Sequence, residues 1–424
     1  MDIGLLEIGF IVVFSTLFVA WWFIETRLLA GVVTLMREWS IFLLSGVVSA
    51  QVLVHWIPHE YHQLIDRELF NLAGMHINLH FLVNEVFMVY FFGVAAKELS
   101  EAILKPGGDL RGIKALVPIV GCIGGIVVPV LIFFLLAEEE DKKAWAVPSA
   151  TDIAIAWLGA RIIWKEGSAP IAFLLALAIG DDFIGMGIIA TFYPQGELSP
   201  VALLWVVSGI FTTFLMKKKA VKYPLFIRWQ PYMIPGILAW WGLHEAGLHP
   251  ALALVFVVPF MPMKGRDEGI FAFHEDEHQH DTVNRFEHAV KPFVDVFLFF
   301  FGLVNAGVYW WGADEGWTSG STAVLVALLV GKTVGIVSSV MLTKFVYFKV
   351  FGKKIGEEFN WKVLLVVSLF AGVGFTVAVF VAEAAGDFPA LKLGALASIV
   401  ALPLGVLVAK ALGVGDRKAK RVDF

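Results

Sequence analysis

Long apolar runs, separated by short polar stretches, extend along almost the whole chain. Residues 115–136, for example, form an apolar stretch without a charged side chain. Runs of about 20 residues match the ~30 Å hydrocarbon core of a bilayer. We therefore predict an all-α polytopic membrane protein with about 13 transmembrane helices. The predicted helices are residues 3–24, 39–57, 79–96, 115–136, 145–163, 169–193, 199–216, 224–243, 248–262, 291–312, 320–343, 361–383 and 389–410.

Two of these predicted helices are interrupted by helix-breaking residues. Pro148 lies inside 145–163, and Gly372 and Gly374 lie inside 361–383. A proline removes a backbone donor and clashes with the preceding helical turn, and glycine weakens a helix. Such a pair of interruptions in two distant parts of a membrane protein indicates a transport site built from two discontinuous, crossed helices. The alternative is that they are simple packing kinks.

The composition supports a membrane protein and excludes several other classes. Of the 424 residues, 58% are hydrophobic and 16% are charged, against about 45–50% and about 25% in soluble domains. The net charge of −5 gives no reason to expect nucleic acid as a partner. Cys122 is the single cysteine, so the chain can form no internal disulfide. The first apolar run is not preceded by Lys or Arg, so we expect a retained helix rather than a signal peptide.

The basic residues alternate strongly between the predicted loops. If the N-terminus lies outside, the cytoplasmic loops and C-terminal tail contain 27 of the 32 Lys and Arg residues. This asymmetry is what the positive-inside rule predicts. We therefore expect an external N-terminus and a cytoplasmic C-terminus. The predicted cytoplasmic loop at 273–281, FHEDEHQHD, could sense pH or bind metal, but a solvated loop is the simpler interpretation.

Four ionisable residues fall near the middle of predicted membrane segments: Asp152, Asp181, Asp182 and Lys332. One charge at the bilayer centre costs at least ~2.5–3.5 kcal/mol. Four charges without a purpose would cost on the order of 10 kcal/mol, which is comparable to the stability of a whole domain. A structural Asp–Lys pair would explain only two of them. Two carboxylates would still lack a cation, and their presence inside the membrane therefore indicates an ion or proton pathway.

The adjacency of Asp181 and Asp182 suggests how such a pathway would work. Neighbouring side chains on a helix point about 100° apart, so one carboxylate can face Lys332 while the other faces an aqueous funnel. Carboxylate oxygens suit small hard cations. The same oxygens can hold either protons or a cation, but not both at once. Competition of this kind is an exchange mechanism.

Nine stretches resemble the NhaA family of sodium/proton antiporters, and together they cover about residues 80–410. They are FLVNEVFM (81–88), PIVGCIGGIVVPVLI (118–132), WAVPSATDIAIA (145–156), LALAIGDDFIGMGIIATFY (175–193), GLHPALA (247–253), FEHAVKPF (286–293), NAGV (305–308), GKTVGI (331–336) and GVGFTVAVFVA (372–382). The resemblance implies that Asp182 is the principal cation ligand and that Asp181 pairs with Lys332. It also implies that Asp152 and Thr151 are the polar residues of the first broken helix.

The resemblance also implies a group of residues involved in pH response. Glu98 matches a cytoplasmic-funnel position of the family. Glu287 and His288, which follow each other in the chain, also match such positions. Glu85 stands where the family usually has an aspartate, and Gly180 stands where an isoleucine is common before the aspartate pair.

The family's architecture implies two inverted repeats, forming a core that moves against an interface domain, in a homodimer. Because the family usually has twelve helices, residues 1–38 would be an additional N-terminal helix with a cytoplasmic link, and 39–424 the antiporter domain. The implied activity is electrogenic exchange of cytoplasmic Na⁺ (and Li⁺) for external protons across a bacterial-type inner membrane. No cofactor is expected beyond the transported ions.

Two other functions are compatible with acidic residues inside a membrane. A sodium-coupled symporter of an organic solute would need a roomier cavity. An intramembrane aspartyl protease would use two aspartates as an acid/base dyad, but AIGDD and ATDIA lack the glycine and tyrosine expected beside such a dyad. Lys332 would also disturb two acids that must share one proton. We therefore expect a transporter and not an enzyme.

Overall fold

The computed structural model describes residues 40–72, 74–104, 115–165, 167–196, 198–220, 222–263, 281–310 and 316–415. The additional helix predicted within 1–38 lies outside the described residues, as does 273–280 of the His-rich loop. The described part is mostly helical, with a two-stranded antiparallel hairpin between α4 (Pro58–Asp66) and α5 (Leu79–Phe81).

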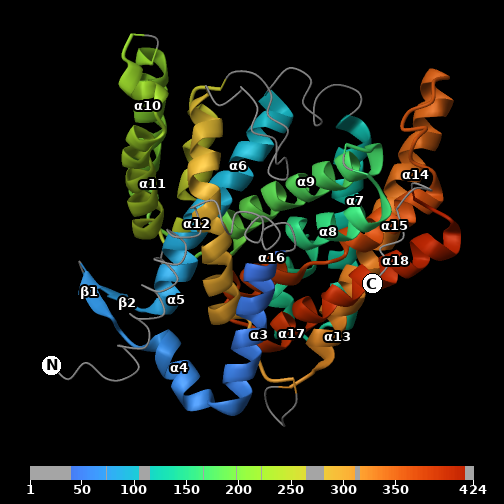
Figure 1. Cartoon of the computed structure of the whole chain (residues 1–424), viewed down its shortest axis with the longest axis horizontal. Helices are drawn as coiled ribbons and strands as arrows, with labels where there is room; N and C mark the ends of the chain where they lie inside the picture. The colour runs from blue at the N-terminus through green and yellow to red at the C-terminus, as the bar shows by residue number, and fades with distance from the viewer. Residues whose placement is uncertain are drawn as a thin grey trace, which may run out of the picture.

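The helices and strands follow one another along the chain with short 3-10 and π segments between them (Figure 1). The elements are α3 (Ile41–Trp56), α4, β1 (Phe70–Leu72), β2 (Met75–Ile77), α5, η1 (Leu82–Phe87), α6 (Met88–Leu104), α7 (Leu116–Leu136), η3 (Asp141–Ala144), η4 (Val147–Ser149), α8 (Ile153–Ile163), α9 (Ala169–Phe192), α10 (Leu203–Lys219), η5 (Pro224–Ile227), η6 (Gln230–Tyr232), α11 (Met233–Glu245), η7 (Pro250–Phe256), η8 (Val258–Phe260), α12 (Thr282–Asn305), α13 (Ser319–Val326), η9 (Ala327–Gly331), α14 (Lys332–Phe351), α15 (Trp361–Ala371), α16 (Phe375–Ala384), α17 (Pro389–Ala397), η10 (Ser398–Val400) and α18 (Ala401–Leu412).

Within the described residues, six helical stretches are long and apolar enough to cross a membrane. They are Leu79–Leu104, Leu116–Leu136, Asp141–Ile163, Ala169–Phe192, Ser319–Phe351 and Pro389–Leu412. A seventh candidate is the pair α15 and α16, which is bent by 50° at a short break. These stretches confirm the prediction of a helical, polytopic membrane protein, whereas the total of 13 helices remains a prediction.

Several predicted segments differ from the observed elements; for example, the helix predicted at 224–243 begins only at Met233. Residues 248–262 do not form a full membrane helix, because this proline-containing stretch folds as the 3-10 segments η7 and η8. The predicted helix 291–312 begins earlier, at Thr282, where the Asp281 side chain accepts a hydrogen bond of 2.8 Å from Val283 N. Its first turns carry charged residues, so hydropathy alone placed the start too late.

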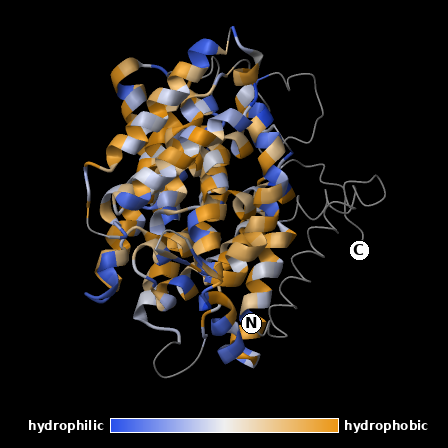
Figure 2. Cartoon of the chain, turned by 90° about the vertical axis from the view of Figure 1, so that its left-hand side faces the viewer, coloured by the Kyte–Doolittle hydropathy of each residue, from blue (hydrophilic) through white to orange (hydrophobic). Residues whose placement is uncertain are grey.

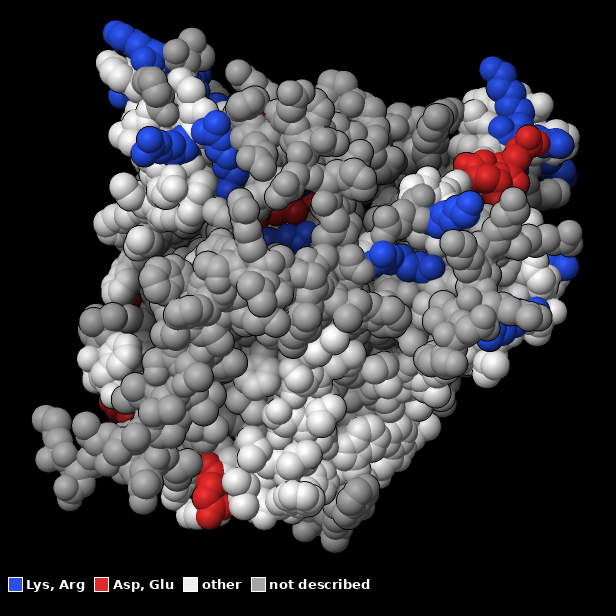
Figure 3. All heavy atoms as spheres, in the orientation of Figure 1, with Lys and Arg blue, Asp and Glu red and all other residues white. Residues whose placement is uncertain are grey.

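Polar and apolar residues are distributed as a membrane requires. Apolar residues dominate the middle of the molecule, and hydrophilic residues are most frequent toward its two ends (Figure 2). On the face shown in Figure 3, Lys and Arg gather over the upper ends of α10 and α14. Lysines occupy the last turn of both helices. One end of the molecule is therefore markedly basic.

The helices α7 and α14 approach each other through glycine. A Cβ atom built on Gly124 would overlap the carbonyl oxygen of Gly335, and a Cβ on Gly335 would overlap that of Gly124. Small residues permit such close backbone contact between membrane helices. This contact holds α14, and with it Lys332, against α7.

We predict that Gly335→Ala destabilises the protein, because the added methyl group has no space at this contact. The loss should be about 1–3 kcal/mol, as for other overpacked sites, and should lower the melting temperature in detergent. Gly187→Ala in α9 is the matched control, since nothing lies within 4 Å of a Cβ there. That variant should melt at or slightly above the parent temperature. Equal melting of both variants would contradict this account of the contact.

Candidate functional site

The span Asp141–Ile163 is broken in its middle. Pro148 lies in the short segment η4, and the chain then runs extended through Ala150 and Asp152 before α8 begins. The backbone N–H of Asp152 donates a hydrogen bond of 2.7 Å to the carbonyl oxygen of Val373. Val373 lies in the break between α15 and α16, so the two interrupted spans meet at their breaks.

The glycines of the second break allow close packing against η9. A Cβ on Gly372 would lie 2.7 Å from the carbonyl oxygen of Leu328, and a Cβ on Gly374 would lie 2.9 Å from the Leu328 side chain. The hydroxyl of Ser398 accepts hydrogen bonds from the backbone N–H groups of Gly374 and Phe375, at 3.0 and 3.2 Å. The break is therefore a supported structure in which backbone donors have partners.

Asp152 caps the N-termini of both half-helices that start at the breaks. Its Oδ1 accepts a hydrogen bond of 3.1 Å from Ile155 N in α8. Its Oδ2 accepts from Thr376 N, at 3.2 Å, and from the Thr376 hydroxyl in α16. The partial positive charges of two helix N-termini thus face one buried carboxylate, which stabilises both the helix ends and the charge.

Lys332 and Asp181 form an ion pair inside the molecule. Lys332 Nζ lies 2.6 Å from Asp181 Oδ2, and the Lys332 side chain is fully buried. Nζ also donates to the hydroxyl of Thr151 at 2.5 Å. This hydroxyl lies 2.8 Å from both Asp181 Oδ2 and the carbonyl oxygen of Ala371, and its single hydrogen can serve one of them at a time. Thr151 therefore links the ion pair to the C-terminus of α15.

Asp181 has a third partner that the sequence did not suggest. The thiol of Cys122 in α7 donates to Asp181 Oδ1 at 3.1 Å. A Cβ on Gly180 would lie 3.1 Å from the Cys122 sulfur, so glycine at this position leaves room for the thiol. Both oxygens of Asp181 are thereby engaged.

Asp182 differs from its neighbour. Its side chain is only 5% exposed, yet its Oδ1 has no hydrogen-bond partner among the described residues. It lines a cavity of about 110 Å³ together with Asp152 and Thr376. The other walls of this cavity come from the starts of α3 and α8 and from α6, α12 and α16. Of the two adjacent acids, Asp182 is the one that lines a cavity and has an unpaired oxygen.

Two of the predicted pH-response residues, Glu98 and Glu287, lie in a separate cluster around Lys97. Lys97 Nζ lies 2.5 Å from Glu287 Oε2, 3.1 Å from Glu101 Oε2 and 3.4 Å from Glu98 Oε1. The Lys97 side chain is fully buried. The structure thus brings Glu98 and Glu287 together, whereas the side chain of His288 is exposed. Sequence reasoning placed Lys97 in a loop and missed its central position.

Glu85 lies in a third place, away from the aspartate pair. It is part of the π segment η1, and its Oε1 accepts a hydrogen bond of 3.2 Å from Gln195. His249 Nδ1 lies 3.7 Å from Glu85 Oε2. The preceding residue, Asn84, exchanges hydrogen bonds of 3.0 and 2.9 Å with Asn305, which ties η1 to the end of α12. This amide pair gives a structural reason for the NAGV motif that begins at Asn305.

Buried ionisable residues at the meeting point of two broken membrane spans define a polytopic transport protein rather than an enzyme. Comparison with known families agrees with this class, because the family model described as Na⁺/H⁺ antiporter 1 matches residues 31–414. The chain therefore belongs to this family of antiporters, and it is a multi-pass bacterial membrane protein.

Individual relatives match over almost their whole length. A protein of Desulfitobacterium hafniense (strain DSM 10664 / DCB-2) named Na(+)/H(+) antiporter NhaA is 41% identical over 395 residues, covering 90% of this chain and 96% of that protein. A protein of the same name from Geotalea uraniireducens (strain Rf4) is 40% identical over 405 residues, covering 91% and 98%. A third, from Jannaschia sp. (strain CCS1), is 34% identical over 410 residues, covering 88% and 96%.

We predict that Lys332→Met strongly destabilises the protein, because it leaves Asp181 as a buried charge without its cation. Breaking a buried pair in this way typically costs about 3–5 kcal/mol. The double variant Lys332→Met/Asp181→Asn should regain part of this loss, since the uncompensated charge is then removed. Thermal unfolding of the parent, the two single variants Lys332→Met and Asp181→Asn, and the double variant in detergent measures both effects. Additive losses in the double variant would show that the two residues do not stabilise each other.

We predict that Asp152→Ala is more destabilising than Asp152→Asn. Alanine removes the acceptor for two helix N-termini, at about 1 kcal/mol for each cap. Asparagine keeps one side-chain oxygen as an acceptor, so its loss should be smaller. Melting temperatures of both variants test this order. Equal melting temperatures would argue against a capping role for Asp152.

Proposed function

We propose that this chain exchanges cytoplasmic Na⁺ and Li⁺ for external protons, with Asp182 as the group for which the cation and the proton compete. The observation that carries this proposal is that Asp182, which lines a cavity, has a buried and unpaired Oδ1, beside an Asp181 whose oxygens are both engaged. The relatives named Na(+)/H(+) antiporter support the choice of ions. No cofactor takes part beyond the transported ions.

The competition follows from the cost of a lone buried charge. A carboxylate taken out of water without a partner is strongly disfavoured. Either a proton or an alkali cation removes this cost at Asp182, and each excludes the other. Oxygen atoms suit a hard cation, and Asp152 and Thr376 line the same cavity. Asp182 is the principal ligand in this proposal, and Asp152 and Thr151 support it.

The buried ion pair makes the exchange electrogenic. In this proposal the ion pair of Asp181 and Lys332, which lie 2.6 Å apart, supplies the second exchanged proton. If the pair releases one proton when a cation binds Asp182, two protons exchange for each Na⁺. One net charge then moves across the membrane in every cycle, so the membrane potential contributes to the driving force.

We also propose how the protein is oriented in the membrane and that it forms a homodimer. The basic end of the molecule faces the cytoplasm, in agreement with the positive-inside rule, so the N-terminus lies outside and the C-terminus inside. The Lys97 cluster, with Glu98 and Glu287, is then the candidate for pH response near the cytoplasmic side. His288 and Glu85 remain candidates for the same role. The protein acts in a bacterial inner membrane as a homodimer of inverted-repeat subunits.

The size of the cavity favours ion exchange over symport of an organic solute. Sites for drug-sized molecules have volumes of about 300–1,000 Å³. The cavity at Asp182 measures about 110 Å³, which suits an ion with a few waters. The symporter therefore remains the second candidate.

We predict that Asp182→Asn abolishes cation-dependent proton release, because an amide neither titrates nor offers a negative charge to the cation. The test uses everted vesicles with a pH-sensitive dye and successive additions of Na⁺, Li⁺ and K⁺. The parent protein should respond to Na⁺ and Li⁺ but not to K⁺. Glu139→Gln is the matched control, since the Glu139 side chain is 88% exposed, and it should retain full exchange. Normal exchange by Asp182→Asn would remove Asp182 from the site.

A further inference from the structure

A second, larger cavity lies at the C-terminal end of α12, whereas the Asp182 cavity borders the middle of that helix. It measures about 430 Å³ and is lined by α4, α5, the end of α12 and the region from α16 to α17. The Asp182 cavity borders α12 at Lys291–Leu298, whereas the second cavity borders it beyond Val304. By the predicted topology, α4 and the second cavity face the outside.

Glu383 contacts a buried lysine and a half-buried histidine at this second cavity. Its Oε1 lies 2.6 Å from His80 Nε2 in α5. Its Oε2 pairs with the ammonium group of Lys392 in α17, and Lys392 Nζ lies 2.6 Å from Asp387 Oδ1. The side chains of Glu383 and Lys392 are 12% and 7% exposed. Neither the sequence motifs nor the proposed exchange site accounts for this cluster.

The two partners of Glu383 come from different parts of the molecule. Lys392 follows Glu383 by nine residues, and its helix α17 packs directly on α16. His80 belongs instead to the span Leu79–Leu104, more than 300 residues earlier in the chain. The Glu383–Lys392 pair therefore lies within one helical hairpin, whereas the Glu383–His80 pair joins that hairpin to another span.

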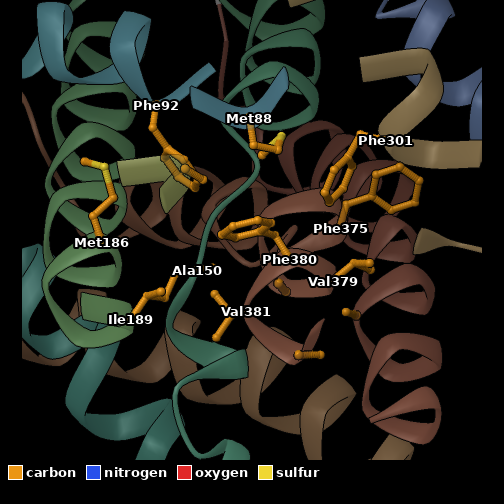
Figure 4. Close-up of a cluster of buried hydrophobic side chains, with 14 of the residues drawn as sticks. Met88, Phe92, Ala150, Met186, Ile189, Phe301, Phe375, Val379, Phe380 and Val381 are labelled. Carbon is orange, nitrogen blue, oxygen red and sulfur yellow. The ribbon is translucent and has the colours of Figure 1, made fainter. Parts of the chain in front are cut away.

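One face of α16 connects the two cavities. Thr376 lines the Asp182 cavity, and Glu383 lines the second cavity. Phe380 lies between them on the same helical face, since residues at i, i+4 and i+7 share a face. The ring of Phe380 packs against Phe92 and Phe301, with centroids at 5.0 and 6.1 Å (Figure 4).

Both cavities therefore lie along one seam. α5, α6 and α12 form one side of it, and α16 forms the other. The aromatic rings around Phe380 separate the cavities, and the pair of Glu383 with His80 spans the seam beyond them. The seam is closed between Asp182 and the second cavity in this structure.

We propose that the Glu383–His80 pair is the latch of the external gate, and that opening the seam breaks this pair while Glu383 stays paired with Lys392. This inference rests on the proposed ion exchange at Asp182, which requires that site to open to the outside and to the cytoplasm in turn. Losing all partners would leave Glu383 as a buried uncompensated charge, which is strongly disfavoured. Lys392 moves with α16 and avoids that cost. The His80 side chain is 36% exposed, so water can replace Glu383 as its hydrogen-bond partner. Glu383 therefore keeps a cationic partner in both states of the latch.

The test measures access to the seam from each side of the membrane. Val377 lines the Asp182 cavity, so Val377→Cys can be labelled with a membrane-impermeant maleimide in right-side-out or everted vesicles. The parent protein, which contains only the buried Cys122, gives the background. Adding His80→Asn should raise the labelling rate from outside at least about threefold and lower it from inside, because the outward-open state becomes more populated.

Two comparisons make the result decisive. His62→Asn is the matched control, since His62 lines the same cavity but is not a partner of Glu383 among the described ion pairs, and it should leave both rates unchanged. A variant that merely loosens the fold would raise labelling from both sides. Unchanged rates, or a rise from both sides, in His80→Asn would overturn the latch.

The same vesicles separate this inference from the proposed function. Dye measurements with Na⁺ and Li⁺ report ion exchange, whereas maleimide labelling reports only which side of the seam is open. If the parent protein exchanges no ions but His80→Asn shifts the labelling outward, the exchange proposal fails and the latch stands. If exchange is normal and the labelling does not shift, the latch fails alone.

Discussion

The pairing of Lys332 with Asp181 is the interaction on which the central site depends. In an apolar interior a charge needs a partner, and this pair neutralises both groups at 2.6 Å with help from Thr151 and Cys122. Asp181 is fully engaged, whereas the adjacent Asp182 lines a cavity and keeps an unpaired oxygen. The two aspartates thus differ in role because of their surroundings, although their chemistry is the same.

The broken helices make this arrangement possible. Continuous helices would bring no backbone polar groups to the centre of the membrane, whereas the two breaks expose helix ends of both signs. Asp152 satisfies the two N-termini, and Thr151 reaches the C-terminal carbonyl of Ala371. Glu383 likewise contacts both His80 and Lys392. The contact with His80 can therefore open while the charge of Glu383 stays paired with Lys392.

Much of the fold was predictable because hydropathy and helix-breaking residues act locally. The run at 115–136 appears as α7, and Pro148, Gly372 and Gly374 do interrupt their spans. The errors also have a local cause. Residues 248–262 are apolar but contain prolines, so they form 3-10 turns, and α12 begins with charged residues that hydropathy does not recognise as membrane helix.

The sequence by itself determined that acidic and basic groups lie inside a membrane protein with two broken spans, because apolar length and residue type suffice for that inference. Only the tertiary structure decided which groups meet. Lys97 gathers Glu98, Glu101 and Glu287 across two helices, and Gly180 makes room for a thiol from α7. Such contacts join residues distant in the chain, and the strength of an electrostatic interaction depends on distance and burial. Sequence position specifies neither.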